Sequence, residues 1–319
     1  MTGVAALPMY DWPEVAGATD RLWAAIRDAL RAAGVAAPDA LDRAVGLMAG
    51  WTHPELVLGQ ACGLPFVRAL AGRVTLLGAI DYGLPGCPPG WYRSAVVVRR
   101  DDPRDTLEAF REARLAVNGF DSQSGWGSIL HHAAPLGGGF FGEVVVSGAH
   151  RASVAMVADG AADIAAIDWV SWRLARRFLP EAGRLRVLLA TEPTPGQALI
   201  AAAGIDAARH AAAVAAGIGG LDAAAKAELG LVGFAPLVAG DYRVIGERLT
   251  RAEALAERLC APESFSPRAE ARGAPARLCA RQPTPPSPPP KLGRGGTCPI
   301  GGREAEKKMG RGHSRRRRR

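Results

Sequence analysis

A strand–helix–strand unit between residues 143 and 168 constrains the fold of this chain most. Residues 143–147 are rich in valine and predict a strand, residues 151–159 have a helical pattern, and residues 163–168 predict a buried strand. A connection through a helix of this kind requires the two strands to be parallel. The unit therefore predicts an α/β protein with an open sheet, in which ligands bind beyond the carboxyl ends of the strands.

A loop with two serines follows another predicted strand. Residues 118–125 come after the apolar run 114–117 and before residues 126–132, which have helical character. Ser122 and Ser124 therefore lie where a helix leaves backbone N–H groups unpaired. Hydroxyls, amides and glycines at the positive end of a helix suit a tetrahedral oxyanion. On this segment alone, an ordinary serine N-cap is the more common explanation.

Two further polar clusters follow strand ends and favour the binding site over the simple cap. Residues 147–150 follow the strand 143–147, and Asp168 ends the strand 163–168. The carboxyl ends of parallel strands meet at one edge of a sheet, so these groups and the serine loop are expected on one rim.

The amino-terminal part repeats this pattern and predicts a second sheet. Tyr10, Trp12, Gln60 and Cys62 are expected to project from its strand ends. The predicted elements are strands at 4–9, 56–60 and 74–80 and helices at 14–33 and 64–70.

The order of the segments predicts two lobes, one inserted into the other. Residues 91–99 form the longest strand-like run, and a helix is expected at 106–113. The chain returns after a strand at 185–190, and residues from about 196 to 258 are alanine-rich and helical in pattern. We predict lobe one from residues 1–98 and 192–260, and lobe two from residues 99–191. Two crossings make a hinge, and clefts between domains are favoured ligand sites.

The net charge of +8 belongs to the carboxyl-terminal tail. From Pro262 onward there are 15 Lys and Arg against 4 Glu, which leaves a net charge of −3 for residues 1–261. We therefore expect no nucleic-acid binding by the folded body. Residues 261–319 contain a proline-rich run and end in Arg315–Arg319, and predict a disordered tail. A nucleic-acid or membrane arm is one explanation of this tail, and an extension foreign to the native protein is the favoured one.

Other sequence signals are weak. No apolar run reaches the roughly 18 residues of a membrane helix, and the odd cysteine count argues against a complete disulfide framework. His131 and His132 lack metal-ligand spacing, and no dinucleotide fingerprint is present, so no metal or cofactor is expected. Ser124, His150 and Asp168 supply the residue types of a hydrolytic triad, but the serine lacks the G-x-S-x-G context.

The chain resembles the phosphate/phosphite/phosphonate substrate-binding proteins of ABC transporters, which belong to the type 2 periplasmic-binding-protein superfamily. The resemblance runs from about residue 4 to residue 245. It is carried by Leu7-Pro8-Met9-Tyr10-Asp11, residues 58–65, Asn118-Gly119 with Asp121-Ser122-Gln123-Ser124-Gly125, residues 147–153 and residues 162–168.

This resemblance implies a site and a function. The headgroup would be held by Ser122, Gln123 and Ser124, with His150 and Asp168 completing the lobe-two side. From lobe one, Tyr10 and Tyr92 would face the ligand, and Cys62 with Gly63 would form a second loop. Where the family often has an aromatic residue and a proline after the turn at 194–196, this chain has Gln197.

The resulting expectation is a solute-binding protein, and not an enzyme, that closes on a small phosphorus oxyanion for an ABC importer. It would be a monomer whose one partner is an ABC permease. The alternatives are a Ser-His-Asp hydrolase that uses the same cleft and a cytosolic small-anion sensor. Residues 1–9 contain no basic region of a secretory signal, which predicts a cytoplasmic protein, or a periplasmic one if the true start lies upstream.

Overall fold

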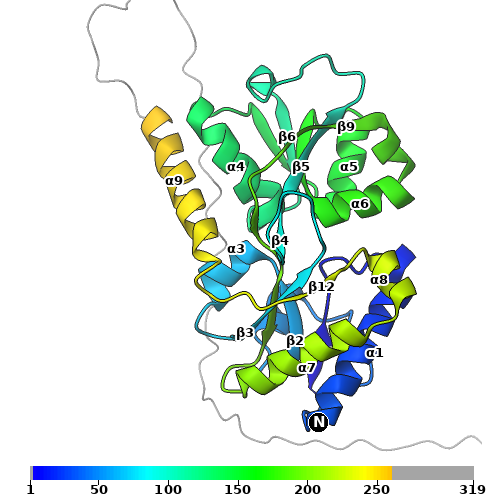
Figure 1. Ribbon diagram of the computed structural model, residues 1–319. Coiled ribbons are helices and arrows are strands. Elements are labelled where there is room, and N and C mark those ends of the chain that lie inside the picture. The colour runs from blue at the N-terminus through cyan, green and yellow to red at the C-terminus, as the bar shows by residue number, and fades with distance from the viewer. Residues whose placement is uncertain (1–2, 261–319) are drawn as a thin grey trace, which may run out of the picture. The chain divides into compact units, whose positions relative to one another are not determined.

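Two five-stranded sheets organise the computed structural model, which describes residues 3–260 (Figure 1). The first has the order β1-β2-β11-β3-β12, with β1 (Val4–Ala6), β2 (Leu56–Ala61), β3 (Thr75–Asp81), β11 (Ala198–Ala201) and β12 (Gly233–Ala235). The second has the order β7-β6-β8-β5-β9, with β5 (Ser94–Arg99), β6 (Arg114–Val117), β7 (Glu143–Val146), β8 (Ile164–Asp168) and β9 (Leu185–Ala190). We call each sheet with its packed helices lobe one and lobe two. The predicted tail at 261–319 lies outside the described residues.

Helices pack against each sheet. Lobe one carries η1 (Pro13–Val15), α1 (Ala16–Ala32), α2 (Leu47–Trp51), α3 (Gly63–Pro65), the π-helix η2 (Phe66–Leu70), α7 (Ala207–Gly220) and α8 (Ala223–Leu229). Lobe two carries η3 (Glu108–Phe110), the π-helix η4 (Gln123–Gly127), α4 (Ser128–Ala133), η5 (Ala134–Leu136), α5 (His150–Ala158), α6 (Trp169–Phe178) and η6 (Pro180–Arg184). The last helix, α9 (Arg243–Cys260), contacts both α4 and α3. No helix within residues 3–260 combines the length and the apolar character that crossing a membrane demands.

The chain crosses between the sheets twice, side by side. The short strands β4 (Trp91–Tyr92) and β10 (Thr194–Pro195) pair antiparallel to each other at the crossing. Each strand that then enters a sheet runs against its neighbours: β5 is antiparallel to β8 and β9, and β11 to β2 and β3. The predicted α/β class with two crossings is confirmed, while the lobe boundaries at 98/99 and 191/192 stay a prediction.

The strand–helix–strand unit that the sequence predicts is present. Strands β7 and β8 both pair parallel to β6, which lies between them, and α5 connects them. The carboxyl ends of these three strands therefore lie at one edge of the sheet, and the residues that follow them share that edge.

Two predicted elements are wrong. The expected helix at 106–113 is the single turn η3, because Glu112 adopts a positive φ of 62° that a right-handed helix cannot continue. The helical pattern assigned from residue 196 onward also covers β11, the middle strand of the first sheet. All four residues of β11 are buried, and a short strand buried on both faces has no period that separates it from a buried helix.

The close packing of α1 and α7 depends on one glycine. In α1 the buried residues recur every three or four positions and face the core: Ala18, Thr19, Leu22, Trp23, Ile26 and Leu30. Where α7 meets this face, a Cβ atom on Gly217 would lie 2.5 Å from the Cα atom of Ile26 and 2.8 Å from the carbonyl oxygen of Ala25. Backbone atoms cannot yield as a flexible side chain can, so this contact requires glycine.

We predict that Gly217→Ala destabilises the protein although alanine is the better helix former. Overpacking costs about 1–3 kcal/mol, against a propensity gain of about 1 kcal/mol. Gly219→Ala in the same helix is the control, because Gly219 is exposed and a Cβ atom there meets nothing within 4 Å. Urea unfolding should show a lower free energy of unfolding for the first variant and an unchanged or higher one for the second. Equal effects at the two positions would contradict the proposed contact.

Candidate functional site

The carboxylate of Asp168 is the most connected group at the strand ends. Asp168 ends β8 and caps α6, because its Oδ1 accepts hydrogen bonds from the amides of Val170 (2.8 Å) and Ser171 (3.3 Å). Its Oδ2 accepts from the Tyr10 hydroxyl at 2.8 Å and from Gln197 Nε2 at 3.1 Å. The side chain is 1% exposed. Four donors fill the acceptor sites of this buried group, and two of them come from outside lobe two.

The serine loop begins a helical segment that runs from η4 into α4. Ser122 is its N-cap, and its Oγ accepts from the amide of Gly125 at 3.0 Å. The hydroxyls of Ser122 and Ser124 lie 3.3 Å apart. The carbonyl of Ser124 accepts from the hydroxyls of Ser94 (2.9 Å) and Ser128 (2.6 Å), which hold this turn in place. The helix end that the sequence predicts is therefore present, with a π turn as its first turn.

His150 joins the serine loop to Asp168. Its Nε2 lies 2.7 Å from Ser124 Oγ and accepts from the backbone amide of Asp168 at 3.5 Å. Because an amide can only donate, we assign Nε2 as the acceptor and the Ser124 hydroxyl as a donor to it. The Nδ1 atom is then the protonated nitrogen, and it is buried without a hydrogen-bond partner.

Lobe one contributes side chains to the same place. The Cys62 Sγ accepts from the amide of Gln123 at 3.3 Å, so a lobe-one thiol meets the first residue of the serine-loop helix. Tyr10 reaches Asp168, and the Tyr92 hydroxyl is buried without a partner. Gly63 begins α3, where a Cβ atom would lie 2.5 Å from Ile245 Cδ1, so its role here is close packing.

Gln197 belongs to this cluster although the sequence did not point to it as a site residue. It lies between β10 and β11, and its Nε2 donates to the Tyr10 hydroxyl (3.2 Å) as well as to Asp168. The one sequence feature that could have indicated Gln197 is its position directly after the turn at 194–196, where the chain crosses between the lobes. A single glutamine there carries no chemical pattern that marks a ligand site.

Unpartnered polar atoms concentrate in this cluster. Within residues 3–260, six buried side-chain nitrogen or oxygen atoms have no hydrogen-bond partner, and five belong to residues at this place: Tyr92 Oη, Asn118 Oδ1, Gln123 Oε1, His150 Nδ1 and Gln197 Oε1. A buried polar atom without a partner costs about 1–3 kcal/mol, so native proteins keep few of them. Their grouping marks this cluster as a candidate ligand site.

The electrostatics of the cluster come from burial. Burial raises the pKa of Asp168 to about 6, against the hydrogen bonds that it accepts, and lowers the pKa of His150 to about 4. Burial also raises the pKa values of the Cys62 thiol and of the Tyr10 and Tyr92 hydroxyls. At pH 7 the imidazole is therefore neutral, and no cation lies among the predicted site residues or Gln197. An anion here would be held by hydrogen bonds and the helix end.

The three residue types of a hydrolytic triad lie together, but they do not make the contacts that a hydrolase uses. Ser124 does contact His150, but the Asp168 carboxylate is taken up by Tyr10, Gln197 and the two amides, and His150 Nδ1 has no partner. A triad needs the carboxylate on the second ring nitrogen to orient the base. The geometry therefore gives no support to nucleophilic catalysis by Ser124.

Comparisons with known proteins place the chain in a family. A family model described as the periplasmic substrate-binding protein of phosphonate ABC transporters matches residues 60–242. No curated protein matches the sequence.

Solved structures resemble the fold at low sequence identity. PhnD1 from Prochlorococcus marinus, in complex with methylphosphonate, has a TM-score of 0.62 at 16% identity, covering 79% of this chain and 99% of that one. A binding protein component of an ABC phosphonate transporter from Pseudomonas aeruginosa has a TM-score of 0.55 at 16% identity, covering 81% and 99%. XAC2383 from Xanthomonas citri, bound to chloride ion, has a TM-score of 0.60 at 16% identity, covering 80% and 98%. These likenesses show the two-lobe fold.

The opposite pKa shifts of Asp168 and His150 predict opposite effects of pH on stability. Between about pH 4 and about pH 6 the folded protein keeps a proton on Asp168 that the unfolded chain releases, so this group lowers the free energy of unfolding as pH rises. His150 releases in the folded state a proton that the unfolded chain keeps, so it raises that free energy over the same range.

We predict that Asp168→Asn reveals the His150 contribution. Relative to the wild type, the free energy of unfolding of this variant should rise more steeply with pH, by at most about 1.4 kcal/mol per pH unit. Urea unfolding at several pH values between about 4 and about 6 measures the difference, in which groups common to both proteins cancel. Parallel profiles for the two proteins would show that Asp168 does not have a raised pKa.

Proposed function

This chain belongs to the periplasmic substrate-binding proteins of phosphonate ABC transporters, and from that membership we propose that it captures a small phosphorus oxyanion, that is phosphate, phosphite or a phosphonate, and delivers it to an ABC permease. The observation that carries the proposal is the meeting of the serine-loop helix end, His150 and Asp168 with Tyr10 of lobe one, in a cluster with five unpartnered polar atoms.

The oxyanion would be bound on the lobe-two side by groups that now partner each other. The hydroxyls of Ser122 and Ser124 would donate to its oxygens. The amide of Gln123, which now donates to Cys62 Sγ, would donate to the ligand instead. Once Ser124 turns to the ligand, His150 accepts only from the amide of Asp168. Its protonated Nδ1 is the donor that remains for an anionic oxygen. Such amide and hydroxyl donors at a helix N-terminus are a common anion site.

Asp168 would make the site sensitive to the protonation state of its ligand. A carboxylate with four donors repels a fully ionised oxyanion unless a proton lies between them. A monoprotonated ligand can supply that proton through its P–OH group, in place of the donor from Tyr10 or Gln197. The ammonium group of an aminoalkyl phosphonate could bind the same oxygen. Selection would then rest on protonation and shape, because no basic side chain belongs to the cluster.

We propose that the lobes close over the ligand, and cross-lobe contacts support this. Arg151 of α5 forms a two-bond ion pair with Glu14 of η1, at 3.0 and 2.8 Å. Arg173 and Arg177 of α6 donate to lobe-one carbonyls, those of Tyr82 (3.0 Å) and Glu228 (2.6 Å). These bonds join side chains to surfaces that a hinge opening at β4 and β10 would separate.

The protein acts in this proposal as a carrier and not as an enzyme, and as a monomer. The sensor alternative binds the same anion and differs in its partner. The hydrolase alternative lacks the carboxylate–imidazole contact that would orient a base.

Ser124→Ala tests the site directly. Removal of this hydroxyl should weaken oxyanion binding by about 1–3 kcal/mol, or about 5- to 150-fold in Kd, because one donor to a buried anion is lost. Isothermal calorimetry on the full chain with phosphate, phosphite and methylphosphonate, guided by thermal shift, gives the affinities. Sulfate serves as the non-phosphorus anion.

Ser147→Ala is the matched control for this experiment. Ser147 lies on the same rim, but its hydroxyl is engaged by the Val117 carbonyl and by the hydroxyl of Ser153. Its loss should leave the affinity unchanged. Equal affinities of Ser124→Ala and the wild type would remove Ser124 from the site, and no binding of any phosphorus oxyanion by well-folded wild type would end the proposed function.

The ion pair between Glu14 and Arg151 gives a second test, of closure. Both side chains are partly exposed, at 27% and 44%, so the pair is screened by water and its loss should weaken ligand affinity by no more than about fivefold. We predict this loss for Glu14→Gln and for Arg151→Gln. The charge-swapped double variant Glu14→Arg/Arg151→Glu should recover part of it. Single variants with wild-type affinity would show that this pair does not stabilise the ligand-bound arrangement.

A further inference from the structure

A groove runs between α6 of lobe two and the end of α8 in lobe one. Its volume is about 420 Å³, within the range of about 300–1,000 Å³ that is typical of small-molecule sites. The lining comes from these two elements: Trp169, Val170, Trp172, Arg173, Leu174, Arg176, Arg177, Ala227, Leu229 and Gly230. None of these residues belongs to the candidate cluster around Asp168, so the groove is a separate feature of the molecule.

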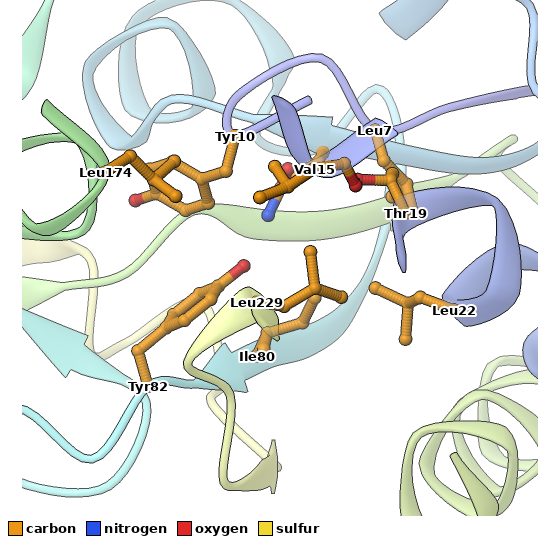
Figure 2. A pocket seen from close by; sticks show the side chains of 10 residues that line it. Leu7, Tyr10, Val15, Thr19, Leu22, Ile80, Tyr82, Leu174 and Leu229 are labelled. Carbon is orange, nitrogen blue, oxygen red and sulfur yellow. The ribbon is translucent and has the colours of Figure 1, made fainter. Parts of the chain in front are cut away.

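The apolar part of the groove is held by packing between the lobes. Leu174 and Leu229 line the groove and also a smaller cavity of about 20 Å³, to which the rings of Tyr10 and Tyr82 contribute (Figure 2). The two leucines belong to one buried cluster, against which the partly buried Trp169 packs. The groove therefore offers an aliphatic and an aromatic surface whose positions are fixed.

The groove concentrates positive charge in a body that is negative overall. Three of its ten lining residues are arginines and none is acidic, whereas residues 1–261 carry a net charge of −3. Arg176 and Arg177 follow Arg173 by three and four positions, so all three lie on one face of α6. Like charges at this spacing destabilise a helix. An anion between the guanidinium groups would remove this repulsion.

Contact between the lobes accounts for only two of these arginines. Arg173 and Arg177 donate to lobe-one carbonyls, and the carboxylate of Glu228 pairs with Arg21 instead, at 2.8 Å. Among the side chains that the structure describes, Arg176 has neither a hydrogen bond nor an ion pair. Three guanidinium groups therefore line the groove without a carboxylate partner.

We propose that this groove is a second ligand site, for an organic anion that carries two or more carboxylates on a flat apolar framework. The carboxylates bind the guanidinium groups, because the planar fork of arginine matches a carboxylate through two parallel hydrogen bonds. The framework packs on Trp169 and on the wall of Leu174 and Leu229. Inorganic phosphate would satisfy the charge but not the apolar surface, so this ligand differs from the oxyanion of the candidate cluster.

A ligand in the groove would bridge the two lobes. Arg176 belongs to α6, whereas Ala227 and Gly230 belong to the lobe-one wall. An anion that contacts both walls stabilises the arrangement in which they meet. This consequence, unlike the site itself, rests on the proposed function: if the lobes close over an oxyanion, each ligand raises the affinity for the other by the same factor.

Arg176→Gln tests the site, with trimesate as the probe, a planar benzene ring that carries three carboxylates. Calorimetry on the full chain should show saturable binding to the wild type. The variant should bind about three- to fivefold more weakly, because an exposed ion pair contributes modestly, and Arg176→Glu about tenfold or more, because it adds repulsion. Benzoate, with one carboxylate on the same ring, should bind more weakly than trimesate.

Arg73→Gln is the matched control, because Arg73 is an exposed arginine that does not line the groove and has no ion pair among the described side chains. It removes the same charge and should leave trimesate binding unchanged. The lobe-one wall is tested by Ala227→Glu, which brings a carboxylate to the groove. It should weaken trimesate binding more than Ala227→Gln, which adds a side chain of the same size without the charge.

The outcomes separate the groove from the candidate cluster. Ser124→Ala should bind trimesate as the wild type does. If the wild type binds trimesate but no phosphorus oxyanion, the proposed function ends and the groove site stands. Trimesate binding that is lost in Ser124→Ala and kept in Arg176→Gln would place the anion in the candidate cluster and overturn the inference.

Three further results would overturn it. They are the absence of saturable trimesate binding by well-folded wild type, equal affinities for trimesate and benzoate, and equal effects of Arg176→Gln and Arg73→Gln. Bridging has its own measurement, the affinity for methylphosphonate with and without saturating trimesate. A higher affinity with trimesate supports bridging, and an unchanged one shows that the groove ligand does not hold the lobes together.

Discussion

The arrangement of the two lobes depends on the hydrogen-bond donors that the buried carboxylate of Asp168 requires. A carboxylate with 1% exposure must have its acceptor sites filled or be protonated. Two donors come from the first turn of α6, and the other two come from Tyr10 in lobe one and from Gln197 at the second chain crossing. Three distant parts of the chain therefore meet at one side chain, and the positions of Tyr10 and Gln197 depend on it.

The same group couples the site to the fold. Because Asp168 caps α6, it fixes the start of the helix that carries Leu174 and the arginines that reach lobe one. Because it also hydrogen-bonds Tyr10, it holds in place an aromatic ring that packs edge-on against Tyr82 of lobe one. Asp168 thus links the start of α6, with its contacts to lobe one, to the hydroxyl of Tyr10.

The chemistry of the site follows from burial more than from charge. The raised pKa of Asp168 and the lowered pKa of His150 both have desolvation as their largest cause. In such surroundings a neutral imidazole, hydroxyls and amides can bind an anion in one protonation state. A basic side chain would instead bind the anion in every protonation state that carries negative charge. This is consistent with membership of the phosphonate substrate-binding proteins.

Local pattern in the sequence was sufficient for the strand–helix–strand unit of lobe two and for the part of the candidate cluster that follows its strands. Strands β6, β7 and β8 and helix α5 appear as predicted, because valine-rich runs, a helical period and glycine stops act over a few residues. Parallel pairing then places Ser124, His150 and Asp168 together without further information, since residues after parallel strands share one edge.

Only the tertiary structure decided the rest. Strand β11 is four buried residues in an alanine-rich region, and its identity comes from the two strands that it pairs with and not from its own sequence. Gln197 joins the candidate cluster because the second crossing brings it to Asp168, and Leu229 is buried with Leu22 because α8 packs against α1. The physical reason is range: residue type and period act between near neighbours, while the role of a buried polar or apolar side chain is set by partners distant in sequence.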